Sequence, residues 1–267
     1  MKKNTRPTAV AGLFYPDNPD VLHDMVSQQL AQAVLTPERH IPKAIIVPHA
    51  GFIYSGEIAA SVYQYLQPVR QIIKHVVIIG PSHRVGFNGL ALSSADYFET
   101  PLGDIPLDQE SQAKLLHIDG VHVFDQAHAA EHSVEVQLPF LQQVLDDFSI
   151  IPIVAGNASP ELVAQVIETL WGGPETLIVI SSDLSHFHDY QTAQQLDNAT
   201  SQAIIELDFD AIHSDNACGC IGVNGLLKFA QQHTLTPSII DLRNSGDTAG
   251  SKDSVVGYGA YLFEEAP

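Results

Sequence analysis

The chain is poor in cysteine, with only Cys218 and Cys220 in 267 residues. Two cysteines so close in sequence are a poor basis for a structural disulfide, which excludes a disulfide-stapled secreted domain. Long apolar runs are also absent, because the longest have the length of a strand and fall far short of a membrane span. No apolar segment of secretory length follows the basic residues Lys2 and Lys3. We therefore expect a cytoplasmic protein that does not enter a membrane.

Basic residues are scarce as well. Lys and Arg total 12 against 31 Asp and Glu, which gives a formal net charge of -19. This balance argues against sequence-independent nucleic-acid binding, which needs cations against phosphates. The negative field favours metal cations, or serves solubility alone. With 45% hydrophobic residues, no linker-like stretch and no internal repeat, the chain is expected to form one packed domain over residues 1–267.

Short apolar runs alternate with longer amphipathic segments along the chain. The runs predict strands at 44–47, 75–79, 90–93, 150–154, 177–180, 239–242 and 255–263. The intervening segments predict helices at 55–66, within 108–116 and 134–145, and at 160–170, 193–207 and 222–230. Pro152 predicts that its strand lies at a sheet edge or is distorted. The alternation predicts an α/β fold with a largely parallel sheet covered by helices on both faces.

Three of these strands run directly into side chains with metal-binding or acid–base chemistry. These are His49 after 44–47, His83 after 75–79, and Asp183 and His186 after 177–180. Ligands of open parallel sheets bind beyond the carboxyl ends of the strands. If the three strands are parallel neighbours, these side chains share one edge of the sheet. A lone histidine at a strand end is usually structural, but the repetition at three strands favours a functional pocket.

Two further segments carry polar groups into apolar surroundings. Glu131 and His132 precede a predicted helix, where the alternative is an ordinary cap made by Ser133. Cys218 precedes a helix that begins near Gly222, and a helix N-terminus lowers the pKa of a thiol; the alternative is a buried, inert cysteine. Two imidazoles and one thiolate suit zinc, copper or iron and leave an open coordination position.

The chain resembles the Memo family in seven motifs that occur in the family's order. These are Ala11-Gly12-Leu13-Phe14-Tyr15-Pro16, Pro48-His49-Ala50-Gly51, Gly80-Pro81-Ser82-His83, Thr100-Pro101-Leu102-Gly103-Asp104, Glu131-His132-Ser133-Val134-Glu135, Ser181-Ser182-Asp183-Leu184-Ser185-His186 and Ala217-Cys218-Gly219. The resemblance implies a fold similar to the extradiol ring-cleaving dioxygenases, which use non-haem iron(II). It also implies that His49, His83 and Cys218 are the metal-site positions, with Asp183, His186 and His132 completing the pocket.

The same resemblance implies a divalent metal, with iron(II) or copper as the first candidates and zinc as the third. Bacterial members are associated with an AMMECR-like protein and a radical SAM protein, which makes these two the candidate partners. A small molecule or a peptide is the expected occupant of the pocket.

Three hypotheses for the function follow. In the first, the protein is a metal-dependent redox or oxygenase-like enzyme, with His186 or His132 as general acid or base and Asp183 orienting a histidine. In the second, it is a non-enzymatic module that holds a peptide or an anion on a reused enzyme fold. A third and weaker hypothesis is a metal-free hydrolase with Cys218 as nucleophile. If Cys218 is not a ligand, Asp183 or Glu131 would supply the charge of the site.

Overall fold

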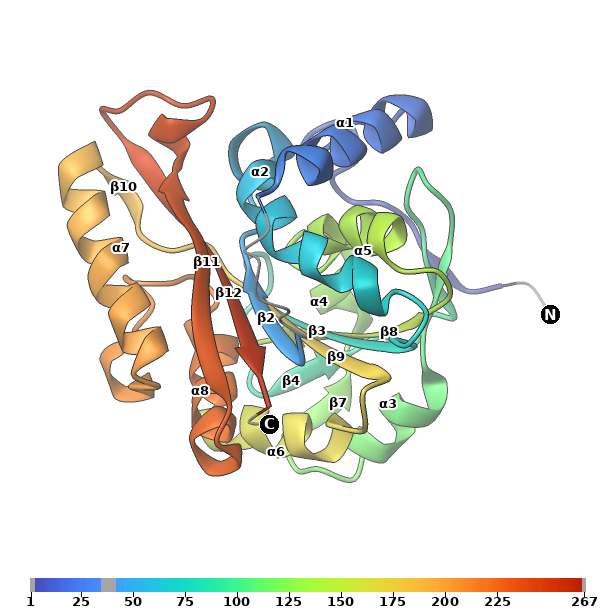
Figure 1. Ribbon diagram of the computed structural model, residues 1–267. Coiled ribbons are helices and arrows are strands. Elements are labelled where there is room, and N and C mark those ends of the chain that lie inside the picture. Colours follow the sequence, from blue (N-terminus) through green and yellow to red (C-terminus); the bar gives the residue numbers. More distant parts are fainter. Residues whose placement is uncertain (1–2, 35–41, 266–267) are drawn as a thin grey trace.

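The computed structural model describes residues 3–34 and 42–265. Within them the main element is a mixed nine-stranded sheet (Figure 1), in the order β10-β12-β2-β9-β3-β8-β4-β7 with β11 attached to β12. The strands of this sheet are β2 (Ala44–Val47), β3 (His75–Pro81), β4 (Leu90–Leu92), β7 (Val121–Val123), β8 (Ser149–Ala155), β9 (Thr176–Ser181), β10 (His186–His188), β11 (Thr236–Asn244) and β12 (Val255–Glu264).

The centre of the sheet is parallel. Strands β2, β9, β3 and β8 are consecutive neighbours and all pair in parallel. Antiparallel pairing begins outside this centre, where β12 joins β2 and β4 joins β8. The predicted α/β fold with a largely parallel sheet is confirmed, and the carboxyl ends of β2, β9 and β3 lie side by side.

Helices cover both faces of the sheet because each central strand is apolar on both sides. Ile45 and Val47 belong to a core shared with α1, α2 and α5, whereas Ala44 and Ile46 belong to a second core shared with α6, α7 and α8. Figure 1 shows α1, α2 and α5 on one side of the sheet and α6 and α8 on the other. The helices are α1 (Pro19–Gln32), α2 (Phe52–Tyr63), α3 (Gln109–Leu115), α4 (Asp125–Ala129), α5 (Leu138–Val144), α6 (Pro160–Leu170), α7 (Tyr190–Ile205) and α8 (Cys220–His233).

Shorter elements complete the chain. The strands β1 (Thr5–Arg6), β5 (Tyr97–Phe98) and β6 (Ile105–Pro106) form a separate small sheet. The 3-10 helices are η1 (Gln64–Val69), η2 (Glu135–Gln137), η3 (Phe209–Ala211) and η4 (Ser245–Asp247). None of the helices within the described residues has both the length and the apolar character needed to cross a bilayer.

The position of the strand that contains Pro152 differs from the sequence prediction. This strand, β8, is internal and lies between β3 and β4. Pro152 is in register with Ile78 of β3, while β4 pairs only with residues 154 and 155 of β8. Because β4 is short, it does not reach Pro152, and no β4 residue pairs with the proline. This explains how an internal strand tolerates a residue without a backbone N–H.

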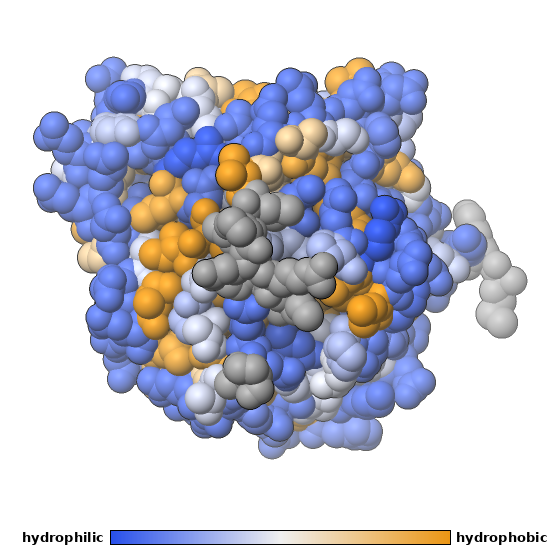
Figure 2. All heavy atoms as spheres, viewed as in Figure 1, coloured by the Kyte–Doolittle hydropathy of each residue, from blue (hydrophilic) through white to orange (hydrophobic). Residues whose placement is uncertain are grey.

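Strand β11 forms an open edge of the sheet. Figure 2 shows a strip of apolar surface over this region on an otherwise largely polar face. Ile239 of β11 is exposed, and the register with β12 shifts between Ile239 and Asp241. Arg243 on the same strand pairs with Asp241. A bulge and charged side chains are the usual means of protecting an edge against pairing with another chain.

Candidate metal centre

The side chains that follow the three central strands lie together, as the sequence predicts. His49 follows β2, His83 follows β3, and Asp183 and His186 follow β9. All four line one cavity of about 610 Å³, which His132 also lines. The carboxyl edge of the parallel sheet is therefore the site.

Three imidazoles form the core of this site. The potential ligand atoms of His49, His83 and His132 all lie within 4.8 Å of one another. The ring centroid of His49 is 5.2 Å from that of His83 and 5.4 Å from that of His132, and the latter two are 4.6 Å apart. Among the described residues this is the group with metal-ligand geometry.

The carboxylate of Glu131 fixes the orientation of His83. Its Oε1 lies 2.8 Å from His83 Nδ1, and its Oε2 accepts the His83 backbone N–H at 2.6 Å. Burial acts to raise the pKa of Glu131, but hydrogen bonds from His83 and from the backbone N–H of Ser133 outweigh it and lower this pKa to about 2. An ionised carboxylate only accepts, so His83 Nδ1 carries a hydrogen, and in the neutral ring Nε2 has the lone pair for a ligand.

The hydroxyl of Ser181 does the same for His49. Ser181 Oγ donates to the carbonyl of Ser133 at 2.6 Å and accepts from the side-chain amide of Gln137 at 2.8 Å. Because the one hydroxyl hydrogen of Ser181 is donated to Ser133, Ser181 Oγ accepts a hydrogen bond from His49 Nδ1 at 2.9 Å. His49 Nε2 is left unprotonated, and burial, together with the charge of His83, lowers the pKa of His49 to about 3.

His132 supplies an imidazole with an unused nitrogen. Its Nδ1 is buried and makes no hydrogen bond, although it lies 3.3 Å from Glu131 Oε1. Burial and the neighbouring His49 lower the pKa of His132 to about 4. His49 and His132 are therefore neutral near neutral pH, which is the state that binds a metal.

The expected ligand set of His49, His83 and Cys218 is corrected by these positions. Cys218 is absent from the three-residue group, and it lines a separate cavity with Ser82 and Phe87. Its Sγ lies 3.3 Å from His49 Nε2 and accepts the backbone N–H of Asp183 at 3.3 Å. The group with ligand geometry is therefore all-histidine, and the Cys218 thiol contacts the Nε2 of His49, the nitrogen that is left free for a ligand.

The expected lowering of the Cys218 thiol pKa is also wrong. Helix α8 does begin just after this residue, at Cys220. Burial nevertheless raises the pKa of Cys218, and the charge of Asp183 adds to the rise, so the thiol stays protonated in the metal-free chain. The free-energy cost of desolvating the thiolate exceeds the stabilisation that the helix N-terminus gives it.

Asp183 and His186 occupy different places around the histidine group. Asp183 is buried, and its Oδ1 accepts the backbone N–H of His49 at 2.7 Å. Burial raises the pKa of Asp183. His186 Nδ1 lies 2.8 Å from the carbonyl of Leu184 and donates to it, so in the neutral ring Nε2 is the acceptor. A register shift at Phe187, whose φ is 61°, interrupts the pairing of β10 with β12 beside His186.

The chain matches the model of a protein family described as Memo-like protein over residues 6–262. It belongs to the Memo-like family. It is 34% identical to a MEMO1 family protein of Thermoplasma acidophilum over 96% of this chain and 98% of that protein. A MEMO1 family protein of Aquifex aeolicus is 35% identical, over 97% and 98% of the two chains. A third, from Methanosarcina barkeri, is 36% identical, over 97% and 100%.

A solved structure shares the fold of this Memo-like chain. It is an uncharacterized protein of Escherichia coli K12, with a TM-score of 0.53 and 12% identity, covering 84% of this chain and 100% of that one. At this identity the likeness concerns the fold alone.

Several residues of the Memo-like site were not found from the sequence. Phe14, Tyr54, Arg84 and Tyr258 line the cavity with the histidines. Two of them had a signal in the sequence, since Phe14 lies in the first family motif and Arg84 directly follows His83. The tyrosines come from α2 and β12, and only the tertiary fold brings them here. The alternative in which Ser133 caps a helix is wrong, because its hydroxyl donates to the carbonyl of Pro81 at 2.8 Å and η2 has no side-chain cap.

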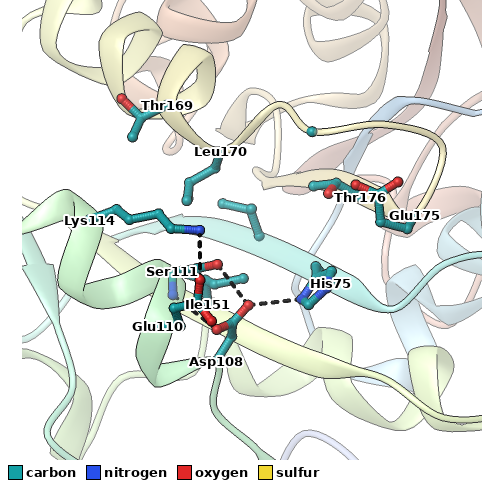
Figure 3. Close-up of a pocket in the computed structure, with 12 residues that line it drawn as sticks. His75, Asp108, Glu110, Ser111, Lys114, Ile151, Thr169, Leu170, Glu175 and Thr176 are labelled. Atoms are coloured by element: carbon teal, nitrogen blue, oxygen red, sulfur yellow. Dashed lines mark hydrogen bonds and ion pairs between the residues drawn. The ribbon is translucent and has the colours of Figure 1, made fainter.

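A second cavity, of about 260 Å³, lies at the opposite edge of the sheet (Figure 3). Its lining includes His75 at the start of β3 and Asp108, which caps α3 by accepting the backbone N–H of Ser111 at 2.9 Å. His75 Nδ1 lies 2.8 Å from Asp108 Oδ2. Both oxygens of Asp108 are thus already engaged, so this histidine and carboxylate hold α3 against β3.

Proposed function

We propose that this Memo-like protein binds a divalent transition metal through His49, His83 and His132 and uses it in redox or oxygenase-like chemistry on a small molecule. One observation carries the proposal. Three imidazole ligand atoms lie within 4.8 Å of one another at the end of a large cavity. Glu131 and Ser181 hold two of these rings with the far nitrogen unprotonated.

The donor chemistry fits a metal. Neutral imidazoles suit iron(II), copper and zinc, and three protein ligands leave coordination positions open. The buried, unpartnered Nδ1 of His132 is a polar atom that the protein alone does not satisfy. Iron(II) or copper is our expectation because a redox role excludes zinc. When bound, such a metal supplies Lewis acidity and electron transfer to an oxygen-containing ligand.

The surrounding side chains have separate tasks in this proposal. His186 presents Nε2 to the cavity and takes a proton from the substrate or returns it. Asp183 positions His49 through its backbone N–H, and Glu131 positions His83. Phe14 narrows the approach, with its ring centroid 4.6 Å from that of His132.

Metal analysis of protein purified anaerobically without chelator tests the proposal. We expect about one divalent metal per chain, and loss of that metal in the His49→Ala/His83→Ala double variant. His75→Gln is the matched control, because His75 begins the strand that His83 follows and should keep the metal. Unchanged metal content in the double variant would refute the site.

Cys218→Ser tells the two candidate ligand sets apart. The all-histidine site predicts that this variant keeps its metal, since Cys218 is not one of the three grouped ligands and its Sγ only contacts His49 Nε2. Loss of the metal would instead show that the sulfur joins the coordination sphere with His49 and His83. Ring shifts of His132 on metal binding, followed by NMR with diamagnetic zinc, identify the third ligand directly.

A non-enzymatic role as an anion-binding module is the second candidate. The observation in its favour is the unpaired guanidinium of Arg84 at the cavity.

We also propose that the chain associates with AMMECR-like and radical SAM proteins. Affinity purification of the chain from a bacterial lysate would test this association.

A further inference from the structure

Arg84 has no acidic partner in the part of the chain that the structure describes. The chain contains 31 acidic residues and only 12 basic ones. Arg6, Arg70 and Arg243 each pair with a carboxylate. Among the described residues Arg84 forms neither an ion pair nor a hydrogen bond, although it lines the cavity of the histidine group. Arg84 is exposed, so its guanidinium is hydrated in the free chain and is available to an anion that enters the cavity.

The cavity that Arg84 borders has two kinds of lining. One is the group of His49, His83 and His132, which would hold the metal. Apolar and aromatic side chains form much of the rest of the wall, including Phe14, Tyr54, Val256 and Tyr258. A ligand that fits must therefore combine a negative group with an apolar body, and about 610 Å³ is room for a small molecule.

The charges of the cavity select the kind of anion. Of the described residues, Arg84 is the one arginine or lysine that lines it, and Asp183 lines it as well. A single cation neutralises a monoanion, whereas a phosphate dianion would leave charge uncompensated near Asp183. The planar guanidinium also matches the two oxygens of a carboxylate with a pair of parallel hydrogen bonds.

We propose that the cavity takes a small organic carboxylate with an apolar body, whose carboxylate is bound by Arg84 beside the histidine group. This names the substrate class of the proposed metal site and rests on that function for its chemistry. The binding step depends only on Arg84 and the apolar wall, so it can be tested without metal.

The probe pair is benzoate and benzamide, which share a ring and differ in charge. We expect metal-free protein, titrated by NMR, to bind benzoate more tightly than benzamide. Arg84→Met should weaken benzoate about tenfold, because a charge-assisted pair of hydrogen bonds is lost, and leave benzamide unchanged. Arg84→Lys, which keeps the charge but loses the planar fork, should lie between the two. Arg70→Gln is the control, because Arg70 precedes β3 whereas Arg84 follows it. This variant should bind benzoate as tightly as the unmodified chain.

Three results would overturn the inference. These are no detectable benzoate binding, equal affinity for benzoate and benzamide, or an unchanged benzoate affinity in Arg84→Met. Tighter binding of inorganic phosphate than of benzoate would also count against a carboxylate. Metal content is measured on the same samples, so a chain that binds benzoate selectively but no metal would refute the proposed function while keeping this inference.

Discussion

At the scale of single residues, the site depends on hydrogen-bond partners that decide which nitrogen of each histidine carries its proton. Glu131 accepts the most hydrogen bonds among these partners. Its Oε1 accepts from the His83 ring and from the backbone N–H groups of His132 and Ser133, and its Oε2 accepts the backbone N–H of His83. Each of these four hydrogen bonds is accepted from an N–H group, so the carboxylate must be ionised and cannot be replaced by a group that donates.

Glu131→Gln tests this role. The side-chain NH₂ of the introduced glutamine would face an N–H group whichever way the amide is turned, so the His83 ring should lose its fixed orientation. We expect metal affinity to fall about 10–100-fold with the three histidines intact. Competition with a fluorescent chelator measures this affinity, and the surface variant Glu110→Gln serves as control. An unchanged affinity would mean that Glu131 supports only the loop.

At the scale of secondary-structure elements, the short helix α4 is joined to β4 through a buried histidine. His128 of α4 is 2% exposed, and its Nε2 donates to the carbonyl of Ala91 in β4 at 3.0 Å. Burial and the charge of Arg6 lower the pKa of His128 to about 4, with the Ala91 hydrogen bond acting in the opposite direction. The helix therefore packs in place only around a neutral imidazole.

This gives a predictable pH dependence of stability. In the unfolded chain His128 takes up a proton near pH ~6.5, but in the folded chain only near pH 4, so the unfolded state binds more protons in between. Stability from this group is complete above about pH 6.5 and is lost as the pH falls toward 4, amounting to about 3 kcal/mol. His128→Gln keeps an amide donor for the carbonyl of Ala91 but has no group that takes up a proton. The variant should therefore lose about 3 kcal/mol less stability than the unmodified chain between about pH 7 and about pH 4. Urea denaturation of the metal-free chains at about pH 7 and about pH 4 measures the difference, with the exposed His23→Gln as control; equal losses in both chains would contradict the assignment.

At the scale of the whole molecule, the N-terminal segment is tied to the loop that carries the site. The Arg6 guanidinium forms a buried ion pair with Glu135 and donates to the backbone carbonyls of His128 and Glu131. Glu135 in turn accepts the backbone N–H of Ala9 at 2.8 Å. The first strand and the metal-site loop, 125 residues apart in sequence, thus form one network.

Arg6→Met should destabilise the protein strongly. It leaves Glu135 buried without its cation and frees the carbonyls that flank the site loop, which costs about 3–5 kcal/mol. The exposed pair of Arg70 and Asp146 provides the comparison, since Arg70→Gln should cost about 1 kcal/mol or less. Urea denaturation gives both values. Similar costs for the two variants would show that the buried pair is no more important than a surface pair.

Most of the fold and the edge of the sheet that carries the site could be predicted from local patterns. Continuous apolar runs at 44–47, 75–79 and 177–180 specify buried parallel strands, and the histidines that follow them must then meet at one edge. Strands β1, β5, β6, β7 and β10 were not predicted. With the exception of β4, the strands of two or three residues have too short a pattern to be distinguished from loops.

The sequence by itself determined which side chains gather, because strand direction and polarity are local properties of the chain. Only the tertiary structure decided which of them form the metal group. His132 joins His49 and His83 because the Glu131 loop packs across the end of β3, while the Cys218 sulfur accepts the backbone N–H of Asp183 and lies 3.3 Å from His49 Nε2. Ligand geometry and desolvation depend on neighbours distant in sequence, and so do the unpaired charge of Arg84 and the raised pKa of Cys218.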